Sequence, residues 1–154
     1  MVLYRVSKLR HADDLSGKGA ELPGGRWNKK GYPAIYLAEN ISLAILETIV
    51  HCQCINDLHN RLILSFEVPD SSIKVYNRSL LPPDWNSIPW NNYTIENGTI
   101  WLESRETLLL KVPSSIVPNE NIFILNPKHV DFQNVRIINR EILQPDNRLV
   151  LAQT

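Results

Sequence analysis

The sequence predicts an α+β domain with few helices, built on a mixed, split β-sheet. Segments with strand patterning outnumber the convincing helical pattern, and they do not alternate regularly with helices, which argues against a doubly wound parallel sheet. The length of 154 residues is that of one domain, so we expect a single domain over 1–154. A chain of this size buries roughly 68–70% of its unfolded surface, so it needs no disulfide or metal to hold the fold.

The charge and hydropathy of the chain argue against nucleic-acid and membrane partners. Lysine plus arginine and aspartate plus glutamate both number 16, whereas nucleic-acid-binding modules usually carry a clustered basic excess. Apolar runs such as 62–64 and 108–110 are much shorter than the roughly 18 residues that a membrane-spanning helix needs. The N-terminus has a strand pattern in place of a secretory signal, so we expect a cytoplasmic protein.

The apolar pattern places the elements in order along the chain. One strong helix is predicted from Asn40, which suits an N-cap, to about Cys54, and a weaker helix over 93–102 is interrupted by Gly98. The predicted strands cover 2–6, 34–38, 62–68, 73–76, 108–112, 121–126 and 135–142.

Two long loops are predicted to be ordered. The loop over 10–33 is rich in glycine and has no sustained periodicity, but it contains Trp27, a large aromatic residue that is normally buried. In this loop Trp27 and Asn28 are interpreted as residues that shape the backbone. The loop over 80–93 combines prolines with two tryptophans, which favours a segment held by aromatic packing.

Glu47 lies on an apolar helical stripe and therefore needs a partner. Leu43, Leu46, Val50 and Cys54 recur at helical spacing, and Glu47 falls on the same face. The opposite side is apolar too, so we expect the helix to be buried nearly all round. A carboxylate in such a place is costly unless it is paired. A structural ion pair with an arginine and a functional role explain it equally well.

Arg26, Tyr36 and Glu47 come from a loop, a strand and a helix. A cation, an aromatic ring and a carboxylate brought together in this way would suit an anionic nucleotide. Taken by itself, Arg5 is best interpreted as a solvated arginine of the first strand. Ser114 has no histidine near it in the sequence, which gives a serine hydrolase little support.

Cysteines and histidines cluster just after the predicted strong helix. Cys52 and Cys54, with His51 and His59, invite interpretation as a metal site, but their spacing fits no standard zinc pattern. Helix packing and surface histidines explain them better, so we expect no metal. The metal site stays open as a minor alternative.

Several short motifs follow the early strand arginine in a fixed order: Gly24-Gly25-Arg26-Trp27-Asn28, Ala34-Ile35-Tyr36-Leu37-Ala38, Leu43-Ala44-Ile45-Leu46-Glu47, Val112-Pro113-Ser114, Asn126-Pro127-Lys128-His129 and Asp146-Asn147-Arg148-Leu149. This order resembles that of RES-domain proteins, the toxin component of bacterial Xre–RES toxin–antitoxin pairs. The resemblance spans nearly the whole chain. It places the arginine, glutamate and serine after which the family is named at Arg26, Glu47 and Ser114.

The resemblance implies a fold similar to ADP-ribosyltransferases, with NAD as the substrate. Members of the family degrade NAD by hydrolysis or phosphorolysis, and others ADP-ribosylate a protein. By this resemblance Arg5 and Arg26 bind the diphosphate of NAD, and Tyr36 stacks on the nicotinamide ring or its ribose. Glu47 stabilises the developing positive charge, or bonds the 2′-hydroxyl, as the nicotinamide–ribose bond breaks. Ser114 bonds the nicotinamide ribose.

The resemblance also implies partners. It predicts an Xre-type antitoxin with a helix-turn-helix, and a homodimeric toxin within the toxin–antitoxin complex, with no direct nucleic-acid or membrane binding by this chain. The acceptor of the ADP-ribosyl group stays open between water, phosphate and a protein side chain. A catalytically inert module that only binds an antitoxin is the alternative from a different functional class.

Overall fold

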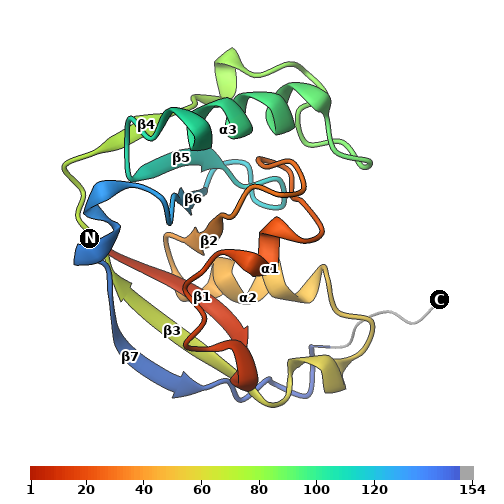
Figure 1. Ribbon diagram of the computed structural model, residues 1–154. Helices are drawn as coiled ribbons and strands as arrows, with labels where there is room; N and C mark the ends of the chain where they lie inside the picture. The colour runs from red at the N-terminus through yellow and green to blue at the C-terminus, as the bar shows by residue number, and fades with distance from the viewer. Residues whose placement is uncertain (150–154) are drawn as a thin grey trace.

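A seven-stranded mixed sheet runs through the protein in the order β4-β5-β6-β2-β1-β3-β7 (Figure 1). The computed structural model describes residues 1–149; residues 150–154 of the predicted domain lie outside the described residues. The strands are β1 (Val2–Lys8), β2 (Ile35–Ala38), β3 (Arg61–Glu67), β4 (Ile73–Val75), β5 (Leu109–Pro113), β6 (Asn121–Leu125) and β7 (Arg136–Ile142). The pair β4–β5 is parallel and the other pairs are antiparallel. The predicted α+β class with a mixed sheet is confirmed.

The sheet is split between β1 and β2. These strands pair only at Tyr4 with Ala38, whereas β1 pairs with β3 along its whole length and β2 pairs with β6 along its whole length. Beyond the single pair the two strands separate, so the halves of the sheet diverge. The predicted split lies here, and it opens the space in which the candidate site is built.

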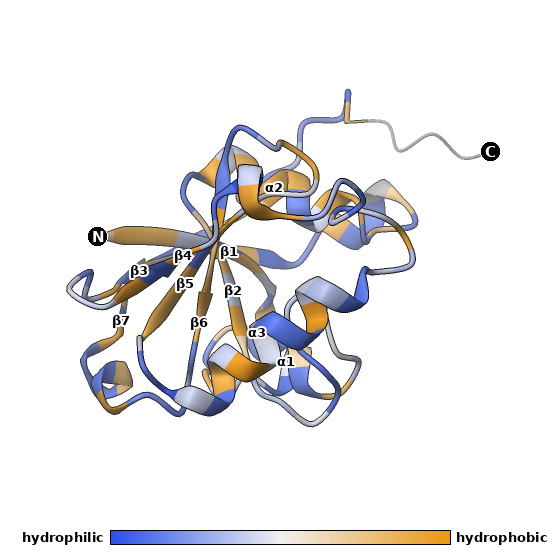
Figure 2. Ribbon diagram, turned by 90° about the horizontal axis from the view of Figure 1, so that it is seen from above, coloured by the Kyte–Doolittle hydropathy of each residue, from blue (hydrophilic) through white to orange (hydrophobic). Residues whose placement is uncertain are grey.

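Apolar residues alternate between the two faces of the sheet and form a core on each. One core lies between the sheet and the two longer helices, and it includes the buried Trp27 and Trp85. The other core contains Phe66 and Leu64 and is covered by loops and the 3-10 turn Val130–Asn134. Figure 2 shows the strands fanned out by the twist of the sheet, with their hydrophobic residues in orange.

Three α-helices accompany the sheet within residues 1–149: α1 (Lys18–Glu21), α2 (Ile41–Ile49) and α3 (Asn92–Ser104). Helix α2 begins as predicted, because the side chain of Asn40 accepts a hydrogen bond from the Leu43 N–H at 2.8 Å. It ends well before Cys54. The Asp57 carboxylate accepts hydrogen bonds from the N–H groups of Gln53 and Cys54, which a continuing helix would use internally.

The prediction that α2 is buried nearly all round is wrong. Leu43 and Ala44 are buried against the sheet, but Leu46 and Val50 are 39% and 54% exposed. Because these two residues lie away from the sheet, the apolar stripe extends beyond the core onto the open side of the helix. Val50 lines the larger of the hollows described below.

Helix α3 forms in spite of Gly98, and the glycine has a packing reason. A Cβ at this position would overlap the carbonyl oxygen of Trp27, so only glycine lets the helix approach the arginine-containing loop so closely. One residue on, the hydroxyl of Thr99 accepts a hydrogen bond from the Lys29 N–H at 3.0 Å. Helix α3 therefore supports the loop that carries Arg26.

Replacing Gly98 with alanine should destabilise the protein. The added methyl group meets backbone rather than a flexible side chain, so the loop or the helix must move, at a cost of about 1–3 kcal/mol. The free energy of unfolding from urea denaturation measures this. Gly19→Ala in α1 is the matched control, because its Cβ would lie 3.6 Å from Arg5 Nη2 at ordinary contact distance. Equal stabilities for the two variants would contradict the packing argument.

Candidate functional site

Two hollows meet where the sheet splits. The smaller, of about 200 Å³, lies between β1, β2 and α2 and is lined in part by Arg5. The larger, of about 880 Å³, lies between α2, the loop that carries Arg26 and the 80–93 segment. Four residues line both hollows: Tyr36, Glu47, His51 and Ile122. Together the two hollows form the groove, and the larger one alone lies within the range of about 300–1,000 Å³ that is common for ligand pockets.

Glu47 lies on the wall that the two hollows share. It projects from the last turn of α2, and its Oε1 accepts a hydrogen bond from the Ser114 hydroxyl at 2.8 Å. Burial raises the pKa of Glu47, while the Ser114 hydrogen bond and the nearby His51 and Arg26 oppose this rise. The structural ion pair, one of the two explanations offered by the sequence, is absent among the described residues, because no arginine approaches Glu47 within salt-bridge distance there.

Ser114 is buried at the end of β5, and its hydroxyl is fully used by the protein. The hydroxyl donates to Glu47 and accepts hydrogen bonds from the N–H groups of Ile116 and Val117, each at 3.1 Å. A serine hydroxyl offers one donor and two acceptor positions. No free position of the hydroxyl remains for the ribose contact that the resemblance implies, and its side-chain partner within residues 1–149 is Glu47.

Arg26 is oriented by the 80–93 segment. Its Nη1 donates to the carbonyl oxygens of Trp85 at 2.9 Å and Ser87 at 3.0 Å. Burial lowers the pKa of Arg26, and the nearby Glu47 charge opposes this. Nε and Nη2 form no hydrogen bond to any residue between 1 and 149, so one edge of the guanidinium is left for bidentate binding of an anion.

Tyr36 presents its ring, while its hydroxyl is held by the arginine-containing loop. The hydroxyl donates to Asn28 Oδ1 at 2.7 Å and accepts a hydrogen bond from the Trp27 N–H at 3.0 Å. Asn28 is itself buried, and its amide group donates to three backbone carbonyls, including that of Ala20. Burial raises the pKa of Tyr36, which keeps the phenol protonated. Only the face and edge of the ring can serve a ligand.

Gly25 allows the arginine-containing loop to fold closely around the Tyr36 hydroxyl. A Cβ on Gly25 would lie 2.6 Å from Asn28 Oδ1 and 2.7 Å from the Tyr36 hydroxyl. Both atoms are fixed by the hydrogen bonds just described, so they have little room to move. The glycine before Arg26 is therefore needed for close packing at this point.

Arg5 is not the solvated strand residue that its sequence context favours. Its side chain is half-buried in the smaller hollow, and burial lowers the pKa of the guanidinium, with the charge of Asp14 opposing this. Within residues 1–149 it forms neither a hydrogen bond nor a salt bridge. Buried charges are usually paired, so an anionic ligand would supply the missing partner.

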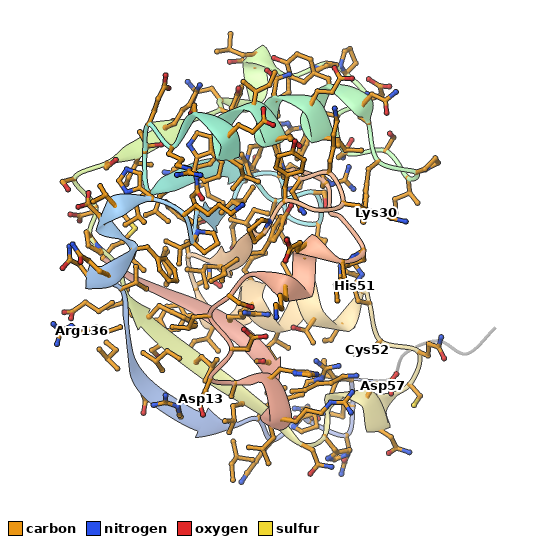
Figure 3. The ribbon with its side chains drawn as sticks, viewed as in Figure 1. Asp13, Lys30, His51, Cys52, Asp57 and Arg136 are labelled. Carbon is orange, nitrogen blue, oxygen red and sulfur yellow. The ribbon has the colours of Figure 1, made fainter. Side chains whose placement is uncertain are left out.

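His51 lies at the candidate site, whereas the sequence interpretation considered it only as a possible metal ligand. It follows α2, where Figure 3 labels it. It lines both hollows and is close enough to Glu47 for its charge to oppose the rise in the pKa of Glu47. The available signal was its position four residues after Glu47, which places two helical side chains together. Cys52 and Cys54 are free thiols. In the described part of the chain, no group of three metal-ligating side chains is gathered.

The arrangement can bind an anion and stabilise a positive charge. Two incompletely paired guanidinium groups, Arg5 and Arg26, lie in hollows that share the carboxylate of Glu47. The reduced dielectric strengthens the interaction of this carboxylate with any cation that forms beside it.

No helix within residues 1–149 is long and apolar enough to cross a membrane.

Comparison with known proteins identifies relatives along the whole chain. The family model described as RES domain matches residues 2–151. A protein named Toxin Res from Yersinia enterocolitica is 46% identical over 134 residues, which is 86% of this chain and 88% of that protein. A Prs ADP-ribosylating toxin from a Sphingobium species is 41% identical over 133 residues, covering 84% of this chain and 83% of the relative.

A solved structure shares the fold. The crystal structure of the Mycobacterium tuberculosis MbcT–MbcA toxin–antitoxin complex contains a chain that aligns with a TM-score of 0.74 at 18% sequence identity. The alignment covers 92% of this chain and 83% of that chain. At this level of identity the likeness establishes the fold, including the mixed sheet.

Replacing Glu47 with glutamine should stabilise the fold at neutral pH. Because burial raises the pKa of Glu47, ionisation of this carboxyl group lowers the free energy of unfolding. The loss is complete above the pKa of Glu47 in the folded state, and it is absent below the pKa of about 4.3 that a glutamate has in the unfolded chain. The amide oxygen of glutamine can still accept from Ser114. We expect urea denaturation at about pH 8 to give Glu47→Gln the higher free energy of unfolding, with the difference shrinking towards about pH 4. A variant less stable than wild type at the higher pH would contradict this.

Proposed function

Because the chain belongs to the RES domain family, we propose that it is the toxin of a type II toxin–antitoxin pair and that it arrests growth by cleaving the nicotinamide–ribose bond of NAD. The names of the relatives support a toxin, and one of them is an ADP-ribosylating toxin, a chemistry that uses NAD as its donor. One observation carries the proposal. A carboxylate, Glu47, is fixed by Ser114 on the wall shared by two hollows that contain Arg5 and Arg26.

The reaction needs little more than a placed carboxylate. The bond between C1″ of the ribose and the nicotinamide nitrogen breaks, and its electron pair leaves with nicotinamide, which becomes neutral and needs no general acid. The ribose becomes oxocarbenium-like, as in glycoside hydrolysis. Glu47 stabilises this positive charge or accepts a hydrogen bond from the 2′-hydroxyl. An acceptor oxygen then bonds to C1″ and releases its proton.

The other residues hold the dinucleotide. The free edge of Arg26 and the unpaired guanidinium of Arg5 bind the diphosphate, whose oxygens match their donor forks. The ring of Tyr36 stacks on the nicotinamide or its ribose and excludes water. His51, next to Glu47, contributes to the polar lining at the same end of the groove.

Ser114 is a positioning residue in this proposal. Its hydroxyl fixes one carboxylate oxygen of Glu47 and favours the ionised form. The other oxygen, Oε2, forms no hydrogen bond to residues 1–149 and is left to face the substrate. This role replaces the ribose contact that the resemblance implies.

The identity of the acceptor separates three versions of the activity. Water yields ADP-ribose and phosphate yields ADP-ribose-1″-phosphate, whereas a protein side chain yields an ADP-ribosylated target, as the name of the Sphingobium relative indicates for that protein. All three share the donor site. The inert antitoxin-binding module is disfavoured, because it would not require Glu47 to be held on the wall of two hollows that contain incompletely paired arginines.

The proposed partner is an antitoxin. The structural relative is a toxin–antitoxin complex, which supports an antitoxin for this chain as well. We assign it to the Xre type with a helix-turn-helix, and we place a toxin homodimer within a cytoplasmic complex. Mass measurement of the co-purified complex tests this assembly, and a monomeric toxin in it would refute the homodimer.

Purified antitoxin-free protein should consume NAD. We expect Glu47→Gln and Arg26→Ala to reduce the rate at least about 100-fold, because each removes electrostatic stabilisation or positioning in the transition state. Products resolved with and without phosphate identify the acceptor. Leu80→Ala is the control, since this exposed residue lies in the 80–93 segment that orients Arg26 but lines neither hollow.

Two results would overturn the proposal. If the variants consume NAD as fast as wild type, Glu47 and Arg26 are not the site. If wild type leaves NAD intact and transfers no label from NAD to any protein of a cell extract, the inert binding module becomes the better account.

Replacing Ser114 with alanine should move the acid limb of the pH–rate profile. The hydrogen bond from Ser114 lowers the pKa of Glu47, so its loss raises that pKa and the rate falls at a higher pH than in wild type. The profile of kcat/KM for NAD measures this shift. A lower rate with an unchanged acid limb would indicate that Ser114 serves only the turn formed by Ile116 and Val117.

A further inference from the structure

Trp90 is a large aromatic residue that the proposed reaction does not use. It lines the larger hollow, on the same 80–93 segment as the buried Trp85, yet 39% of its surface is exposed. Its neighbour Ile88 is 88% exposed and lines the same hollow. Exposed apolar residues that gather at a hollow usually serve a ligand or a partner.

The segment that carries Trp90 is held to the candidate site. Arg26 Nη1 donates to the carbonyl oxygens of Trp85 and Ser87, and the Ser87 hydroxyl donates to the Pro89 carbonyl at 3.0 Å. The indole of Trp85 is buried in the core and anchors the start of this stretch. The backbone directly before Trp90 is therefore held at the candidate site.

The larger hollow has room beside Trp90 because few bulky side chains line it. Several of its lining residues have small or no side chains and leave its wall open: Gly19, Ala20, Pro23, Gly24 and Gly25. Together with Ile88, Pro89 and Trp90 they give an apolar lining. A purine base is planar and stacks well on an indole ring. Such stacking does not depend on hydrogen bonds to the base.

We propose that Trp90 forms a stacking platform for the adenine base of NAD. Arg26 connects the two ends of the groove: its guanidinium interacts with the charge of Glu47 and is hydrogen-bonded to the segment that leads to Trp90. The order Glu47, Arg26, Trp90 then matches the order of nicotinamide ribose, diphosphate and adenine in the dinucleotide. This inference rests on the proposed function and assigns the part of the substrate that the reaction leaves unchanged.

A protein partner is the competing occupant of an exposed tryptophan. The base is favoured because Trp90 lines the same hollow as Glu47 and Tyr36 and because a hydrogen-bonded connection through Arg26 fixes it relative to them. An indole that served only a partner would not need this connection to the catalytic end of the groove.

The test compares NAD, ADP-ribose and nicotinamide mononucleotide, which lacks the adenylate half. For Trp90→Ala we expect an increase of about 5- to 30-fold in the KM for NAD and in the calorimetric Kd for ADP-ribose, because losing a base–aromatic stack costs about 1–2 kcal/mol. Trp90→Phe keeps an aromatic ring, so its KM for NAD and its Kd for ADP-ribose should stay within about threefold of the wild-type values. Affinity for the mononucleotide should not change in either variant, and Leu80→Ala is the surface control.

Each other outcome overturns the inference in a recognisable way. If wild type cleaves NAD while Trp90→Ala keeps the wild-type KM and ADP-ribose Kd, the adenine subsite is wrong and the proposed function stands. If that variant loses only antitoxin binding, the tryptophan belongs to a protein interface. If wild type neither cleaves NAD nor binds ADP-ribose, the proposed function itself fails and the inference fails with it.

Discussion

The hydrogen bond from the Ser114 hydroxyl to Glu47 connects the parts of the site. It links the turn after β5 to the last turn of α2, so one half of the split sheet fixes a carboxylate carried by a helix that packs on both β1 and β2. A half-buried carboxylate without such a partner would be costly. With the partner, Glu47 keeps one oxygen fixed and offers the other to the groove.

The split in the sheet and the packing of the arginine-containing loop give this carboxylate its surroundings. Since β1 and β2 pair only at Tyr4 with Ala38, Arg5 reaches a hollow that a fully paired sheet would close. On the other side, the contact between Gly98 and the Trp27 backbone lets α3 support the loop, and that loop holds the hydroxyl of Tyr36. Features that look merely structural thus set the positions of the candidate binding groups.

Local patterns were enough to predict the strands and the start of α2, because alternation and the Asn40 cap act over a few residues. The early end of α2 was missed, because the carboxylate of Asp57 captures backbone N–H groups across a turn. The burial of Arg5 and the full use of the Ser114 hydroxyl depend on contacts between segments far apart in the chain. Family resemblance could name these residues, but only the fold shows that Ser114 bonds Glu47.

The most direct test is a crystal structure of the Glu47→Gln protein with intact NAD. The account predicts that the nicotinamide ribose lies at residue 47, with its 2′-hydroxyl within about 3 Å of the amide, and that the diphosphate lies against the free edge of Arg26. Ser114 should still bond residue 47 and not the ribose. NAD bound outside the two hollows, or bound in the groove with its nicotinamide end away from residue 47, would contradict the account.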